Sequence, residues 1–183
     1  MCAPDKTGTS EPPVRKAASK ELVYDKVTMQ KNKREPLSWQ MIEQMFPWIP
    51  AGPVLDVGAG AGQLAARFAD HGFAVTALDK HAPVQEHAPL KWWSQDLRTT
   101  TLKPASWAAI VALNSFPFLP QADQHPQLER LCTALQPGGI LIFSTFTPQD
   151  PGAQQTLAQD LHGTPAPTGT LSLQTLQTLF KDW

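Results

Sequence analysis

The chain has 183 residues, of which 42% are hydrophobic, and its formal net charge is −1. This is enough for one substantial core and too short for two ordinary domains. No dense basic stripe points to nucleic acid, and no apolar stretch approaches the ~20 residues that span a bilayer.

Residues 1–20 are rich in Pro, Thr, Ser and Lys and contain almost no large apolar side chain. Such a segment cannot offset its ordering entropy, so we expect a disordered tail followed by one folded domain over residues 21–183. The tail has no apolar segment behind its basic residues, unlike a secretory signal. We therefore expect a cytoplasmic protein.

The first helix is expected to begin at Glu35-Pro36, because proline favours the first helical turn. Apolar residues then recur at helical spacing from Leu37 to Phe46, and Pro47 is expected to end the run.

The central part of the chain alternates short apolar runs with helical patterns. Expected helices have apolar stripes over residues 64–69, closed by Gly72, and over residues 128–135, ended by Pro137-Gly138-Gly139. Expected strands cover residues 53–57, 73–79, 91–94, 107–113 and 140–146, with a short helix or turn interrupted by Pro83. This alternation predicts βαβ units and a parallel sheet, so the fold class is α/β.

The C-terminal part is expected to contain two more helices. One covers Ala153–Leu161 and is followed by a connector over residues 163–169. The other places Leu173, Leu176 and Phe180 on one face, with Ser172 as its N-cap.

A glycine loop carries the clearest functional pattern. The run Asp56-Val57-Gly58-Ala59-Gly60-Ala61-Gly62 stands between an expected strand and an expected helix. Glycines allow a tight turn and a close backbone approach to a ligand, while the helix N-terminus favours an anion.

The spacing in this loop favours one cofactor class. The dinucleotide pattern G-x-G-x-x-G would need a third glycine where the chain has Gln63. Asp56 would crowd a pyrophosphate, whereas it can accept a hydrogen bond from the ammonium of S-adenosylmethionine (SAM). Asp79 ends the next strand about 20 residues after Gly60, at the spacing where an acid reaches the ribose hydroxyls. An NAD-dependent oxidoreductase remains a weaker alternative.

These residues resemble the first two motifs of class I SAM-dependent methyltransferases, at Val54–Gly62 and Val75–Asp79. Gln95-Asp96-Leu97 resembles the acidic motif that holds the adenine amino group, and Leu135–Leu141 resembles the turn before strand five. The resemblance implies a Rossmann-like three-layer sandwich with SAM as cofactor. Ala108 departs from the class, which commonly has an acidic residue there.

The finer resemblance is divided between two groups. Val75–Lys80, Phe118-Leu119-Pro120 and Leu176–Trp183 are similar to tellurite-resistance and thiopurine-type methyltransferases. Val75–Asp79 and Phe143–Phe146 are also similar to the malonyl-carrier-protein methyltransferase of biotin synthesis.

The expected cofactor-binding residues follow from the motifs and from position. Asn114 is included because it follows strand four, where ligands bind in open α/β sheets, and we expect it at the methionine end. The full set is Asp56, Gly58, Ala59, Gly60, Gly62, Asp79, Lys80, Asp96, Leu97 and Asn114. The two cysteines and five scattered histidines predict no metal site.

The expected activity is methyl transfer from SAM to an oxygen, nitrogen or sulfur atom of a small-molecule or carrier-bound acceptor. Alignment in a dry pocket can supply most of the rate, so no acid or base is identified. A non-catalytic SAM-binding or interaction module remains the alternative.

The class I fold has two strands after strand five, and the sequence ends before either of them. We therefore expect a C-terminally incomplete domain whose sheet lacks the last two of the usual seven strands. Strand 140–146 would then be an apolar edge, which favours self-association or a partner and weakened catalysis.

Overall fold

The computed structural model describes residues 37–81, 90–150 and 169–181 of the chain. The chain forms two compact units, residues 1–48 and residues 49–183. The expected tail, the short helix or turn at Pro83 and the helix at Ala153–Leu161 lie outside the described residues.

The described part of the first unit contains helix α1 (Leu37–Glu43) and the 3₁₀ helix η1 (Phe46–Trp48). The amides of Met45 and Trp48 donate to carbonyls three residues earlier, at 2.8 and 2.9 Å. The prediction of a helix is confirmed, but Pro47 does not end it. Pro47 lies inside η1, because the first turn of a helix does not need its missing N–H.

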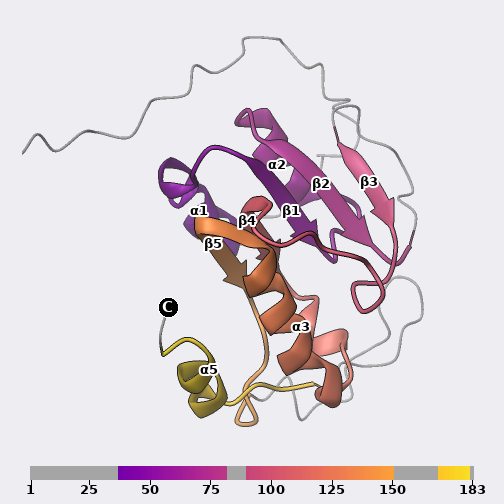
Figure 1. Ribbon diagram of the computed structural model, residues 1–183, viewed down its shortest axis with the longest axis vertical. Coiled ribbons are helices and arrows are strands. Elements are labelled where there is room, and N and C mark those ends of the chain that lie inside the picture. Colours follow the sequence, from indigo (N-terminus) through magenta and orange to yellow (C-terminus); the bar gives the residue numbers. More distant parts are fainter. Residues whose placement is uncertain (1–36, 82–89, 151–168, 182–183) are drawn as a thin grey trace, which may run out of the picture. The chain divides into compact units, whose positions relative to one another are not determined.

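The second unit is built on a five-stranded sheet in which every neighbouring pair is parallel (Figure 1). The order is β3-β2-β1-β4-β5. The strands are β1 (Pro53–Val57), β2 (Ala74–Asp79), β3 (Lys91–Ser94), β4 (Trp107–Ala112) and β5 (Leu135–Phe143). The α/β prediction is confirmed, and the first four strands lie close to their expected bounds.

The strand order places β1 at the centre, between β2 and β4. The chain first runs outward from β1 to β3, then returns to the other side of β1 for β4 and β5. The carboxyl ends of β1 and β4 therefore form the topological switch point, where open α/β sheets bind their ligands.

Two helices cover opposite faces of this sheet (Figure 1). On β1, Leu55 and Val57 belong to a core that includes Leu128 and Leu131 of α3 (Gln121–Ala134). Helix α2 (Gln63–Asp70) contacts β1 and β2, and its buried side chains lie outside that core. Since side chains alternate along a strand, the sheet forms the middle of three layers.

Strand β5 departs from its prediction at both ends. It begins at Leu135, which pairs with Trp107, and it ends at Phe143. The Pro137-Gly138-Gly139 run therefore lies within the strand, at an irregularity in its pairing with β4. Proline and glycine are tolerated there because a bulge leaves backbone groups outside the ladder. Among the described strands, β5 pairs with β4 alone.

Helix α5 (Leu173–Leu179) packs near the end of β5, where the Phe143 and Phe180 ring centroids are 6.1 Å apart. The Ser172 hydroxyl accepts the Thr175 amide at 3.0 Å, which confirms the predicted N-cap. None of the helices in the described ranges is both long and apolar enough to cross a membrane.

Candidate functional site

The glycine loop joins the end of β1 to the start of α2. The amides of Gly58 and Ala59 donate to the Leu78 carbonyl of β2, at 2.8 and 3.1 Å, and the Gly62 amide donates to the Ala59 carbonyl at 2.8 Å. The loop is thus tied to β2 and folded back on itself. The expected strand, glycine loop and helix arrangement is confirmed.

The three glycines of this loop differ in their surroundings. A Cβ on Gly58 would collide with the Cβ of Ser115, and one on Gly62 would lie 2.7 Å from the Trp92 ring. A Cβ on Gly60 would meet nothing within 4 Å. Gly58 and Gly62 are therefore needed for packing, whereas the open space beside Gly60 is where a ligand can approach the backbone.

Asp79 lies against this open position. Its carboxylate accepts the Gly60 amide at 2.8 Å and the His81 amide at 2.9 Å. The structure thus joins two predicted site residues that are 19 positions apart. Each carboxylate oxygen keeps a second lone pair with which it can accept a hydroxyl group. The predicted ribose contact remains a prediction.

Asp56 is the buried acid of the site. Its side chain is 3% exposed, and its Oδ2 atom has no hydrogen-bond partner. Burial raises the pKa of Asp56 to about 7, although a hydrogen bond from the Ala65 backbone lowers it, and the charge of Asp79 raises it further. A buried carboxylate with an unused oxygen is suited to a cationic group such as an ammonium.

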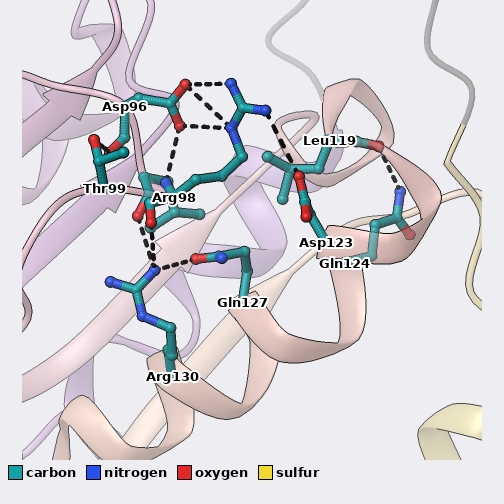
Figure 2. A network of polar contacts seen from close by, with 9 residues as sticks. Asp96, Arg98, Thr99, Leu119, Asp123, Gln124, Gln127 and Arg130 are labelled. Carbon is teal, nitrogen blue, oxygen red and sulfur yellow. Dashed lines mark hydrogen bonds and ion pairs between the residues drawn. The ribbon is translucent and has the colours of Figure 1, made fainter.

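Asp96 follows β3 and is held by Arg98 (Figure 2). Its Oδ2 accepts Arg98 Nη2 at 2.7 Å, and its Oδ1 accepts Arg98 Nε at 3.0 Å and the Arg98 amide at 2.9 Å. These contacts hold the pKa of Asp96 below its ordinary value. Arg98 also lies 3.6 Å from Asp123 of α3. Asp96 is therefore ionised, and it already has a cationic partner.

Arg130 of α3 anchors the loop that carries Asp96 (Figure 2). Its guanidinium donates to the carbonyls of Leu97, Arg98 and Thr100. The Leu97 side chain is buried in the core of the α3 face. The Leu97 side chain therefore contributes to packing, and its expected contact with the cofactor remains a prediction.

Asn114 follows β4 with a left-handed backbone, φ 53°. Its amide donates to the Ser144 hydroxyl at 2.7 Å, and that hydroxyl lies 3.3 Å from Asn114 Oδ1. The next residue, Ser115, is the one that lies against Gly58. The structure thus places Asn114 one residue from the glycine loop contact, at the switch point where it was expected.

The sequence interpretation missed Arg98, Arg130 and Ser144, whereas Ser115 lies in the segment after strand four that it placed at the ligand. Ser144 follows β5 directly, at the same edge of the sheet as the predicted site. This position was a usable signal. The two arginines carry no motif, so only the structure identifies them.

Two other titratable side chains lie around these residues, and the expected cofactor contact of Lys80 remains a prediction. Lys80 is exposed and contributes to the lowered pKa of Asp96 through its charge. Burial, with a smaller effect from Glu129, raises the pKa of Cys132 to about 11, so the thiol stays protonated at neutral pH. The described residues contain no group of three side chains that could hold a metal ion.

Comparison with known proteins assigns the family. A family model described as a methyltransferase domain matches residues 29–182. The chain belongs to this family. The predicted class is therefore confirmed at the level of the methyltransferase domain.

Curated relatives match part of this methyltransferase-domain chain. It is 37% identical over 107 residues to an uncharacterized methyltransferase of Mycobacterium bovis, covering 54% of the chain and 53% of the relative. It is 28% identical over 120 residues to the ubiquinone biosynthesis O-methyltransferase of Coxiella burnetii, covering 61% and 50%. The chain spans about half the length of the curated relatives it matches.

A solved structure shares the fold. The 1,6-didemethyltoxoflavin-N1-methyltransferase of Burkholderia thailandensis, crystallised with 1,6-didemethyltoxoflavin and S-adenosylhomocysteine, has a TM-score of 0.60 and 19% identity. The match covers 79% of this chain and 64% of that one. The Rossmann-like methyltransferase fold is thereby confirmed.

Proposed function

We propose that this domain binds SAM at the carboxyl ends of β1, β2 and β4 and transfers its methyl group to a small-molecule or carrier-bound acceptor. The observation that carries the proposal is the pair of acids around the glycine loop. Asp56 has a buried oxygen without a partner, and Asp79 is bound to Gly60 beside open space.

The residues present fit the parts of SAM. Asp56 would hold the ammonium, Asp79 the ribose hydroxyls and Asp96 the adenine amino group. SAM supplies an electrophilic methyl group on a sulfonium, and the acceptor atom displaces S-adenosylhomocysteine. This chain would orient the cofactor and exclude water, which needs no dedicated acid or base.

Support for a small acceptor comes from the proteins that this chain resembles. One relative is named for ubiquinone biosynthesis, and the similar solved structure contains 1,6-didemethyltoxoflavin. Both names point to small molecules. A screen with methyl-labelled SAM would identify the atom that accepts the methyl group.

Titration calorimetry tests the cofactor assignment directly. The protein should bind SAM and S-adenosylhomocysteine and should not bind NADH. Asp79→Asn should weaken SAM binding, whereas the exposed Glu129→Gln on α3 is the matched control and should bind like the wild type. Binding of NADH without SAM would overturn the proposal.

A screen with methyl-labelled SAM and mixed small-molecule acceptors then tests transfer. Transfer of label in the presence of an acceptor supports a methyltransferase. Tight SAM binding without transfer to any acceptor would instead favour a non-catalytic SAM-binding module.

We also propose that the β5 edge is a site of association. Within the described sheet β5 has one neighbour, and its residues from Ile140 to Phe143 are partly exposed. Unpaired strand edges with apolar side chains associate readily. Light scattering over a concentration series should detect assembly by the wild type and less of it by Ile142→Lys. A wild type that stays monomeric throughout would contradict this proposal.

A further inference from the structure

Three polar residues that follow β4 and β5 form a connected unit at the switch point of the sheet. They are Asn114, Ser115 and Ser144. Two of them lie within one loop, and the third comes from the neighbouring strand end, 30 positions later in the chain. The unit reaches the glycine loop through the contact between Ser115 and Gly58.

Ser144 holds this unit in place. The Ser144 amide still continues the ladder by donating to the Ala112 carbonyl at 3.1 Å. Its hydroxyl then accepts the Asn114 amide at 2.7 Å, so a side chain takes the place of a backbone acceptor there. The same hydroxyl can donate its proton to Asn114 Oδ1, at 3.3 Å. Both contacts favour the left-handed turn at Asn114.

That turn decides where Ser115 lies. A non-glycine residue pays a conformational cost for a positive φ, so the Ser144 contacts compensate the backbone of Asn114. The turn carries Ser115 across the end of β4 to Gly58. Ser115 then lies so close that position 58 has no room for a side chain. Gly58 is two residues from Asp56, the acid with the unused buried oxygen.

The Ser115 hydroxyl is itself unused. Its Oγ is buried without a hydrogen-bond partner, although the residue as a whole is partly exposed. A buried hydroxyl without a partner is costly, and native proteins seldom keep one without a use. Rotation between staggered χ1 positions can move this oxygen at little cost. A hydroxyl both donates and accepts, so it suits a group that carries an ammonium and a carboxylate.

We propose that the Ser115 hydroxyl is a further ligand for the α-amino-acid end of SAM, and that Ser144 is the positioning residue that places it through Asn114. This inference rests on the proposed function, since it takes SAM as the cofactor. The inference adds residues that recognise the methionine end of SAM. These residues follow β4 and β5, whereas Asp79 and Asp96 lie at the ends of β2 and β3, on the other side of β1.

The test compares two ligands of which only one carries this end. SAM carries the amino-acid group on a charged sulfonium, whereas 5′-methylthioadenosine keeps the adenine, the ribose and a neutral thioether sulfur without it. Ser115→Ala should weaken SAM binding about tenfold, the effect of losing one hydrogen bond to a charged group, and should leave methylthioadenosine binding unchanged. Ser144→Ala should weaken SAM binding by a similar factor, and Ser144→Thr, which retains the hydroxyl, should restore it.

Controls separate the possible failures. Ser106→Ala, which removes a hydroxyl bonded to the Pro104 carbonyl away from the site, should bind both ligands like the wild type. Thermal melts followed by circular dichroism establish that each variant is folded. Wild-type SAM affinity in folded Ser115→Ala, or equal losses for both ligands, would overturn the inference while leaving the proposed function intact. A wild-type protein that binds neither ligand would overturn both.

Discussion

Asp56→Asn should stabilise the ligand-free domain while weakening its cofactor binding. Burial raises the pKa of Asp56 from 3.8 to about 7. At about 1.4 kcal/mol per pH unit, keeping this carboxylate ionised at pH 8 costs the fold about 4 kcal/mol. Because the folded pKa is raised, the cost is absent below the unfolded pKa, grows as the pH rises, and is complete above about pH 7.

The asparagine variant carries no charge and escapes this cost, but its amide has hydrogen-bonding needs of its own. We therefore expect a net gain of about 1–3 kcal/mol at pH 8. For a domain of this size, that raises the melting temperature by about 2–4 °C per kcal/mol. SAM affinity should fall at least about tenfold, since the ammonium loses a charged partner.

Thermal melts without ligand, recorded from about pH 5 to about pH 8.5, measure the first effect. The advantage of Asp56→Asn over the wild type should shrink toward acidic pH, because protonation removes the wild-type cost. Calorimetry with SAM measures the second effect, with Glu129→Gln as the control. Equal melting of wild type and variant at every pH would refute the reasoning about burial.

Three further predictions follow from the loop and its acids. Gly58→Ala should lower the free energy of unfolding by about 2–4 kcal/mol, because the new Cβ collides with Ser115 and the backbone has a positive φ. Gly60→Ala should lower it by only about 1 kcal/mol and should chiefly weaken SAM binding. Urea unfolding measures the stability of each variant, and calorimetry measures its SAM affinity. Asp79→Ala should leave a folded domain by circular dichroism with weaker SAM binding, and wild-type affinity would refute its ribose role. Asp96→Ala should abolish discrimination between SAM and its inosine analogue, so equal affinity of the wild type for both compounds would refute the adenine role.

Much of the fold could be predicted because the local patterns are strong. In β1 the residues after Pro53 are buried on both faces of a parallel sheet, and such strands are mostly apolar, with Asp56 as the exception here. Gly72 marked the end of α2 because it adopts a left-handed conformation, φ 84°. By contrast, Pro137-Gly138-Gly139 suggested a turn before the strand, and the structure includes it in β5 through irregular pairing.

The missed site residues act through contacts between distant parts of the chain. Ser144 and Asn114 are 30 positions apart, and Arg130 donates a hydrogen bond to the Leu97 carbonyl, 33 positions earlier in the chain. No local spacing indicates such pairs, because they depend on the order of the strands and on the packing of α3. The acids were identifiable because each lies within two residues of the end of a strand.

The three predicted acids differ in what a cofactor can add to them. Asp96 already has Arg98 as a cationic partner, and Asp79 accepts two backbone amides. Asp56 alone among the three has a buried oxygen without a partner. The electrostatic gain on binding SAM should therefore concentrate at the ammonium, because only there does binding relieve an existing cost. It follows that adenosine derivatives without the amino-acid end should bind much more weakly than S-adenosylhomocysteine, although they keep every adenine and ribose contact.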